Sequence, residues 1–333
     1  MTKPTFQAAA DVFDGWRDDV LAGSPPVFWP VGTGELARLE IGPGLVTLLG
    51  GAPGAGKTAF VMQLVTDALR LTPTLRALVC NVEMSPRVLL DRQLARLSGI
   101  DLGTIRYRRF DAEHAERIDQ AMHTLEPLAD RLAFVRPPFN LENVAASADG
   151  FRADLLVLDY IQRIPPPGNH ADKRVAVNAT MDYLRQFADT GIAVLVLAAV
   201  GRTKDSKGRS SYSGDGLNLA SFRESSELEF GADDAFMLVP SEGGVECGTV
   251  TVAVKHLKAR HTQPKDLLLD FDRRTQRFTE AEDPRTWKPG GSARPARQPK
   301  STQVQSALAA AWAKTPSADD DADASSGSGD ESW

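Results

Sequence analysis

The residues best suited to do chemistry form a glycine-rich stretch near the start of the chain. Residues 51–58 read Gly-Ala-Pro-Gly-Ala-Gly-Lys-Thr, which is the G-x-x-x-x-G-K-T pattern of a phosphate-binding loop. Glycines let backbone N–H groups turn toward phosphate oxygens, Lys57 would reach the β- and γ-phosphates, and Thr58 would hold Mg²⁺. The stretch therefore predicts a nucleoside triphosphate site with Mg²⁺. Its expected nucleotide-binding residues are Gly51, Ala52, Pro53, Gly54, Ala55, Gly56, Lys57 and Thr58.

Two acidic residues could complete this site. Asp159 follows four apolar residues at the end of a strand-like run, as in a Walker B element, so we expect it to hold Mg²⁺ or its water beside Thr58. Glu83 follows the next strand-like run after the phosphate loop, where a carboxylate could polarise the attacking water. By its position alone, a solvated residue at a strand end is the simpler interpretation of Glu83. Paired with the loop, Asp159 is the stronger of the two signals.

The elements that must position these residues alternate between strands and helices. An apolar run at 45–49 predicts a buried strand before the loop, and 59–65 predicts a helix after it. This alternation favours an α/β fold with a mostly parallel sheet and helices on both faces. The close spacing of the last strands predicts antiparallel additions at the C-terminal edge. Further strands are predicted at 76–82, 132–135, 154–159, 192–198, 234–239, 249–254 and 265–271, and further helices at 86–97, 112–125, 141–148 and 175–188.

Composition places the chain among ordinary globular proteins. Of its 333 residues, 42% are hydrophobic and 25% are charged. No apolar run approaches the length of a membrane span, and the first residues do not form a signal segment. The two cysteines, Cys80 and Cys247, are far apart, so neither a metal site nor a disulfide framework is expected, and a cytoplasmic location is the default. The net charge of −6 disfavours a basic coat for nucleic acid but allows a local basic loop.

The two ends of the chain differ from its middle. Residues 1–29 form a short arm whose apolar residues recur at helical spacing between Ala8 and Leu21, which predicts a helix that docks either on its own domain or on a neighbouring subunit. Residues 30–283 read as one domain. Residues 284–333 combine a basic, Pro-rich linker with an acidic tail, and we expect them to be disordered. The tail could dock on a replication protein, although a solubilising role is the simpler interpretation.

Several motifs together resemble the C-terminal ATPase domain of DnaB-type replicative helicases, which are superfamily 4 helicases. The order and spacing of these motifs also match over about residues 30–280, and the Glu-Met-Ser and Arg-Glu-Ser runs are the most specific of them. The motifs are Gly-Gly-Ala-Pro-Gly-Ala-Gly-Lys-Thr at 50–58, Val-Glu-Met-Ser at 82–85 with Arg92 downstream, Leu-Asp-Tyr-Ile-Gln at 158–162, Phe-Arg-Glu-Ser-Ser-Glu-Leu-Glu-Phe-Gly-Ala-Asp at 222–233, Lys-Ala-Arg-His at 258–261 and Gln-Arg-Phe at 276–278.

The resemblance implies a RecA-like P-loop NTPase that binds ATP with Mg²⁺ and assembles as a homo-hexamer. Glu83 would be the catalytic carboxylate and Lys57 the phosphate-binding lysine. Lys258 and Arg260 would reach the γ-phosphate of a neighbouring subunit, because a cation must stabilise charge as the phosphoryl group departs. In an alternative register the signal lies at Lys255, which puts Leu257 in the finger position. A solvated strand edge is the remaining interpretation of this cluster.

The resemblance also implies two loops that hold single-stranded DNA, at 163–175 and 201–220. The second loop carries cations and small donor side chains, which suits phosphate contacts without base reading. A disordered, solvated loop is the plainer interpretation. The expected DNA-binding residues are Arg202, Lys204, Lys207 and Arg209.

The chain departs from the family pattern at three places. About 30 residues precede the ATPase region, which puts primase coupling through the family's helical N-terminal domain in question. Ala199 stands where the family usually has a glutamine that senses the γ-phosphate, and Arg202 is one candidate to replace it. His261-Thr262 replaces the family's Asn-Gly. We therefore expect an ATP-driven helicase that translocates on single-stranded DNA in DNA replication, or alternatively a DNA-binding ATPase that acts as a switch or loader without processive unwinding. The run Arg223-Glu224-Ser225 argues against a recombination- or clock-type ATPase.

Overall fold

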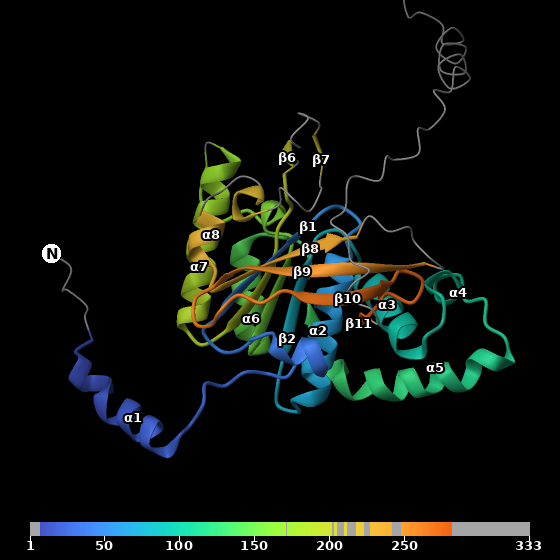
Figure 1. The fold of residues 1–333 in the computed structure, drawn as a ribbon, viewed down its shortest axis with the longest axis horizontal. Helices are drawn as coiled ribbons and strands as arrows, with labels where there is room; N and C mark the ends of the chain where they lie inside the picture. The colour runs from blue at the N-terminus through green and yellow to red at the C-terminus, as the bar shows by residue number, and fades with distance from the viewer. Residues whose placement is uncertain are drawn as a thin grey trace, which may run out of the picture. The chain divides into compact units, whose positions relative to one another are not determined.

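The fold is built on one large sheet, seen in a computed structural model (Figure 1). The structure describes residues 7–170, 172–201, 203–204, 210–211, 218–222, 227–241 and 248–281. The nine strands lie in the order β11-β10-β9-β8-β1-β5-β4-β2-β3. Their bounds are β1 Val46–Gly51, β2 Ala77–Asn81, β3 Leu132–Phe134, β4 Leu155–Asp159, β5 Ala193–Leu197, β8 Asp234–Pro240, β9 Thr249–Ala259, β10 Leu267–Asp272 and β11 Arg277–Glu280.

The sheet has a parallel part and an antiparallel edge. Strands β8, β1, β5, β4, β2 and β3 pair in parallel, whereas β9, β10 and β11 pair antiparallel. This confirms the predicted α/β fold class with antiparallel additions at the C-terminal edge. The sequence did not predict β11, which is short and follows a turn at 273–276. A separate two-stranded pair, β6 (Thr203–Lys204) and β7 (Ser210–Ser211), lies outside the large sheet.

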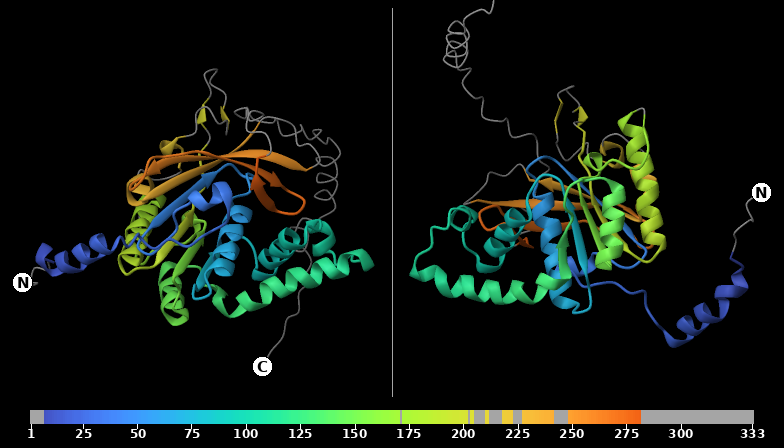
Figure 2. Two further views of the ribbon diagram at one scale, coloured as in Figure 1. Left: turned by 60° about the horizontal axis from the view of Figure 1, so that its bottom comes forward. Right: turned by 180° about the vertical axis from the view of Figure 1, so that it is seen from behind.

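Helices cover both faces of the sheet, as the views in Figure 2 show. Neighbouring residues along a strand point to opposite faces, so Leu48 belongs to one buried cluster and Leu49 to the other. The Leu49 cluster includes α2 (Lys57–Leu71), and the Leu48 cluster includes α6 (Leu141–Phe151) and α7 (Lys173–Asp189). The remaining bounds are η1 Gly34–Arg38, α3 Pro86–Ser98, α4 Leu102–Arg106, α5 Ala112–Leu125, η2 Glu126–Arg131, η3 Ile161–Arg163, η5 Leu219–Ser221 and α8 Glu227–Gly231.

Cys80 lies in the buried interior of β2. Its side chain belongs to the same apolar cluster as Leu48, and burial raises the pKa of its thiol to about 12. Such a thiol behaves as a small apolar side chain. Cys247 lies outside the described residues.

The helix predicted near the N-terminus is α1, Ala9–Ala22. None of its residues is buried, and its large apolar side chains are about half exposed or more. What this helix docks on stays a prediction. The linker and tail at 284–333 lie outside the described residues. Within the part of the chain that is described, no helix is long and apolar enough to cross a membrane.

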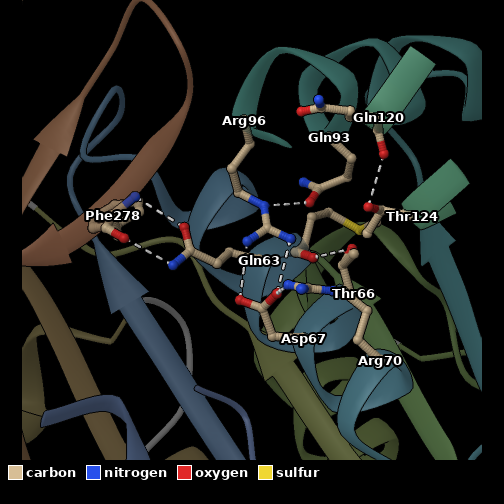
Figure 3. A network of polar contacts seen from close by, with 10 residues as sticks. Gln63, Thr66, Asp67, Arg70, Gln93, Arg96, Gln120, Thr124 and Phe278 are labelled. Atoms are coloured by element: carbon tan, nitrogen blue, oxygen red, sulfur yellow. Dashed lines mark hydrogen bonds and ion pairs between the residues drawn. The ribbon is translucent and has the colours of Figure 1, made fainter. Parts of the chain in front are cut away.

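A buried polar network fastens α2 to its neighbours (Figure 3). The guanidinium of Arg96 on α3 donates to both carboxylate oxygens of Asp67 on α2, at 3.0 and 3.1 Å. The side-chain amide of Gln63 bonds to both backbone groups of Phe278 on β11, each at 2.9 Å. A bidentate pair of this kind fixes orientation as well as distance. The helix that follows the phosphate loop is therefore held against α3 and against the antiparallel edge of the sheet.

Candidate nucleotide site

The phosphate loop turns sharply between β1 and α2. Gly56 precedes α2 with a φ of 90°, in the left-handed region that favours glycine. A Cβ at Gly56 would also lie 2.8 Å from the ring of Phe271 and 2.9 Å from the ring of Phe278. These two rings stack on each other with centroids 4.3 Å apart. The stacked rings support the loop from behind, and only glycine fits against them.

The residues of the predicted loop run from the end of β1 to the first turn of α2. Gly51 ends β1, and Ala55 is buried and donates its backbone N–H to the carbonyl of Ala52 at 3.1 Å. The remaining loop residues line a cavity of about 590 Å³. They are Pro53, Gly54, Gly56, Lys57 and Thr58.

Lys57 lies across the loop. Its Nζ donates to the carbonyl of Gly51 at 2.7 Å and to that of Ala52 at 3.1 Å. Burial lowers the pKa of Lys57, and the negative charges of Asp159 and Glu83 partly offset this effect. An ammonium group with little solvent around it interacts strongly with an anion. The lysine is thus placed to meet a phosphate that enters the loop.

Asp159 and Thr58 meet at the predicted Mg²⁺ position. The Thr58 hydroxyl donates to Asp159 Oδ2 at 2.6 Å, and the Asn81 amide donates to the same oxygen at 2.7 Å. Burial raises the pKa of Asp159, while the Thr58 hydrogen bond acts in the opposite direction. Hydroxyl and carboxylate oxygens are hard ligands that suit Mg²⁺ when phosphates and waters complete its octahedron. The two residues therefore fit the ion, and Thr58 and Asp159 would hold it.

Asn81 links the two acidic residues and was not singled out from the sequence. It pairs with Asp159 across the parallel strands β2 and β4. Its Oδ1 accepts the backbone N–H groups of Glu83 at 3.0 Å and Met84 at 2.7 Å. One side chain thus orients the carboxylate of Asp159 and turns the chain so that Glu83 lines the cavity. The available signal was an asparagine at the end of a strand, two residues before Glu83.

The other residues that line the cavity were also not predicted as site residues from the sequence. Arg92 on α3 lines the cavity, burial lowers its pKa, and its Nε atom is buried without a hydrogen-bond partner among the described residues. Arg92 belongs to one of the family motifs, but no role was predicted for it. The other lining residues come from the family motifs or from segments far along the chain, and no role in the site was predicted for them. They are Met84, Tyr160, Ala199, Phe271, Arg273 and Gln276.

Lys258 and Arg260 lie outside the wall of the nucleotide cavity. Neither is among the described residues that line the cavity. Lys258 Nζ donates to the carbonyls of Phe230 at 3.1 Å and Ala232 at 2.7 Å. Arg260 donates to the Asp233 carboxylate at 2.5 Å and to the Phe230 carbonyl at 3.1 Å. Both cations are therefore held together against the end of α8, away from their own chain's nucleotide cavity.

A β-bulge sets the register of these cations. Phe236 pairs with His256 and Ala235 with Lys258, so Leu257 is the extra residue on β9. A bulge re-aims the side chains that follow it. Leu257 packs against the cluster of buried residues that contains Leu48. This packing favours Arg260 over the alternative register with Leu257 in the finger position.

The predicted DNA-binding residues fall mostly outside the described chain. Arg202, Lys207 and Arg209 are not described, and for Lys204 the structure gives only its backbone in β6. These four residues stay predictions.

Comparison with known proteins agrees with the motifs. The model of the DnaB-like helicase C-terminal domain matches residues 40–280. Among solved structures, an ATPase domain matches with 16% identity and a TM-score of 0.69, over 84% of this chain and 100% of that one. A DnaB-like replicative helicase, described with its interactions with primase, matches with 16% identity and a TM-score of 0.68, over 84% of this chain and 68% of that one. A search of curated proteins finds no match.

At this level of identity the two solved structures show a shared fold. The family itself is shown by the sequence model, which spans more than half of the 333 residues and includes the phosphate loop, Glu83, Asp159 and Arg260. The resemblance read from the motifs is thereby confirmed. The chain belongs to the DnaB-like helicase C-terminal domain family.

Proposed function

We propose that the chain hydrolyses ATP with Mg²⁺ at the cavity between the phosphate loop and Asp159. The supporting observation is that Lys57, Glu83 and Asp159 come from three separate elements and meet at one cavity. Glu83 accepts a proton from the attacking water and orients it, while Lys57 neutralises charge on the phosphates. Thr58 and Asp159 would hold Mg²⁺, which would supply further positive charge beside the phosphates.

The active site in this proposal is shared between two copies of the chain. Lys258 and Arg260 do not line their own cavity but stand together at the end of β9, with Arg260 40% exposed in its side chain. A cation supplied from a neighbouring subunit is a known way to stabilise the departing phosphoryl group. We therefore propose a homo-hexameric ring in which each site is completed in trans. The exposed apolar side chains of α1 would dock on the adjacent subunit.

Hydrolysis in such a ring would drive movement on single-stranded DNA during DNA replication, in the cytoplasm. Backbone phosphates would be gripped by the segment that contains Arg202, Lys204, Lys207 and Arg209. The acidic tail would contact a replication protein.

A second candidate is a DNA-binding ATPase that acts as a switch or loader without processive unwinding. The observation in favour of this second function is that Ala199 lines the cavity. Its methyl group cannot hydrogen-bond to a phosphate. Strand separation on a forked duplex distinguishes the two functions. The motor unwinds it with ATP, whereas the switch binds the single strand and hydrolyses ATP without separating the strands.

The decisive test is a mass determination with a non-hydrolysable ATP analogue and single-stranded DNA, paired with ATPase assays with and without DNA. We expect a hexamer and a turnover stimulated by DNA. A monomer at micromolar concentration, with no stimulation, would reject the ring motor. Lys57→Ala is the background control, because it removes the phosphate-binding ammonium group.

A further inference from the structure

Phe230 on α8 exposes its ring to solvent. Among the described residues it is the most exposed aromatic residue, with 68% of its surface accessible. Leu228 and Ala232, two positions to either side of it, are fully buried, so the segment is anchored in the core while Phe230 faces outward. A single exposed aromatic ring is common on protein surfaces. Its position in the fold must therefore decide whether Phe230 has a role.

Phe230 lies beside the two cations at the end of β9. Its carbonyl accepts from Lys258 Nζ and from a guanidinium nitrogen of Arg260, each at 3.1 Å. The backbone of Arg260 is bonded to Asp233, which pairs with Val46 at the start of β1. The phosphate loop begins at the other end of β1, about 17 Å away, because a strand rises about 3.3 Å per residue. Phe230 and the two cations thus share one surface, at the end of the sheet opposite to the nucleotide cavity.

A second cavity lies at the same end of the sheet as the nucleotide cavity, where β2 and β3 end. Its volume is about 330 Å³, and we call it the apolar pocket. Most of its lining is apolar and includes Val82, Phe134 and Phe139, whereas Glu83 and Met84 line both cavities. An apolar cavity of about 150 Å³ is large enough to bind benzene. The apolar pocket therefore has the size and the walls to receive a phenylalanine ring.

From this arrangement we infer that Phe230 of one copy seats in the apolar pocket of the next copy, beside the nucleotide cavity that receives Arg260. In a ring, one end of each subunit meets the opposite end of its neighbour. The carboxylates of Glu83 and Asp159, together with bound phosphates, attract Lys258 and Arg260. Since the two cavities share the wall at Glu83, a contact that brings the cations to one also brings the ring to the other.

The two parts of this contact have different physical roles. Opposite charges orient the approaching subunits, and burial of the aromatic ring supplies affinity. A ring seated next to Glu83 also fixes how far Arg260 enters the neighbouring cavity. The inference rests on the proposed ring with shared sites, and it names the contact that aligns its subunits.

Assembly of the full chain with a saturating non-hydrolysable ATP analogue tests the energetic part. Sedimentation over a concentration series gives the midpoint of assembly. In Phe230→Ala this midpoint should rise about 30-fold or more, as for a buried aromatic anchor at an interface. Nucleotide affinity of the isolated chain should not change, because Phe230 does not line the nucleotide cavity. Tyr107→Ala, at an aromatic residue that is 64% exposed at the end of α4, is the matched control and should keep the natural midpoint.

A second substitution tests whether the apolar pocket receives the ring. Phe139→Ala removes an aromatic wall of this pocket and lies outside the nucleotide cavity. Substitutions of two groups that contact each other are not additive in free energy. The double variant should therefore assemble about as weakly as Phe230→Ala alone, whereas independent effects would multiply.

Cross-linking locates the contact without depending on stability. Chains with Phe230→Cys are mixed with chains that carry Arg136→Cys, at an exposed residue of the apolar pocket, and a short bis-maleimide is added with the ATP analogue. Cys247 is replaced by serine in both chains, and burial of the Cys80 thiol, which raises its pKa to about 12, keeps it unreactive. We expect a covalent dimer joined at these two positions, identified by mass spectrometry. No dimer should form when Tyr107→Cys replaces Arg136→Cys.

The inference and the proposed function fail in different ways. If the natural chain assembles, then a natural midpoint in Phe230→Ala, multiplying effects in the double variant or an absent cross-link would overturn the inference and leave the ring intact. Failure of the proposed function shows before any substitution is made, as a natural chain that stays monomeric or does not hydrolyse ATP. A monomer with the analogue bound excludes the ring and, with it, the contact of Phe230.

Discussion

The two regions that carry the expected catalytic residues are built in opposite ways. The wall formed by the phosphate loop and Asp159 is complete within one chain, because Thr58, Asn81 and Asp159 are linked by hydrogen bonds of 2.6 and 2.7 Å. Arg260 and Lys258, at the other edge of the parallel part of the sheet, bond to acceptors in and just after α8. The residues of the first region line an open cavity, whereas Lys258 and Arg260 are hydrogen-bonded to acceptors of their own chain.

This difference indicates where regulation could act. The residues of the first wall already line the cavity within one chain, so in the proposed function an isolated subunit would bind nucleotide. In the proposed ring, Arg260 would exchange its contacts with Asp233 and the Phe230 carbonyl for a phosphate on another subunit. Such an exchange is favourable only when a neighbour presents a strong anion. Assembly would thus control hydrolysis more than it controls binding.

The largest effect is expected from Arg260→Ala. If its guanidinium acts in trans, the turnover of the assembled protein should fall about 10³- to 10⁵-fold, the usual value of an arginine finger. The nucleotide affinity of the isolated chain should not change, because Arg260 does not line the cavity. Turnover at saturating ATP and a fluorescent-nucleotide titration measure the two quantities. Arg38→Ala, at an exposed arginine paired with Glu35, is the matched control.

Glu83→Gln tests the proposed general base at the nucleotide cavity. Loss of the general base should lower turnover about 10²- to 10⁴-fold while ATP still binds. Mixing this variant with Arg260→Ala should restore activity. In a mixed ring, a site can take Glu83 from an Arg260→Ala chain and Arg260 from a Glu83→Gln chain. Such a site is complete. Mixed rings with no recovery at any ratio would contradict a site shared between subunits.

The sequence signals for the first region are local. The loop at 51–58 and the apolar run before Asp159 are contiguous stretches whose residue types are dictated by backbone geometry and burial. The parallel fold followed from the alternation of strands and helices. The positions of Glu83 and Arg260 came from the family resemblance rather than from local pattern.

What the sequence did not reveal rests on contacts between distant residues. Gln63 and Phe278 are 215 residues apart, and no pattern marks the amide of one as the partner of the other's backbone. The pairing of Gln162 with Ala199 is similar, since any residue has the backbone groups that Gln162 uses. Side chain–backbone contacts constrain only one of the two residue types. They therefore leave a weaker signal in the sequence than two paired side chains would leave.

Asp233→Ala tests whether the region around Lys258 and Arg260 also stabilises the fold. Its carboxylate is almost fully buried and accepts from Arg185, Arg260 and the Val46 N–H. Removing it leaves these donors without their shared acceptor, and we expect the free energy of unfolding to fall by about 3–5 kcal/mol. Arg260→Ala, at a more exposed partner, should cost about 1 kcal/mol or less. Chemical denaturation measures both, and equal losses would contradict an anchor centred on Asp233.

The smallest effect concerns the pH dependence of Lys258. Burial, followed by the positive charge of Arg260, lowers the pKa of Lys258 below its ordinary value. As the pH rises, Lys258 therefore loses its proton earlier than a solvated lysine, whose pKa is about 10.4. If the charged form acts on a neighbouring phosphate, turnover should decline on the alkaline side with a midpoint below that value. In Lys258→Arg the charge persists, so this decline should move to higher pH. Lys57 titrates in both proteins, so the difference between their pH profiles isolates Lys258. Superimposable profiles would show that its charge takes no part in the reaction.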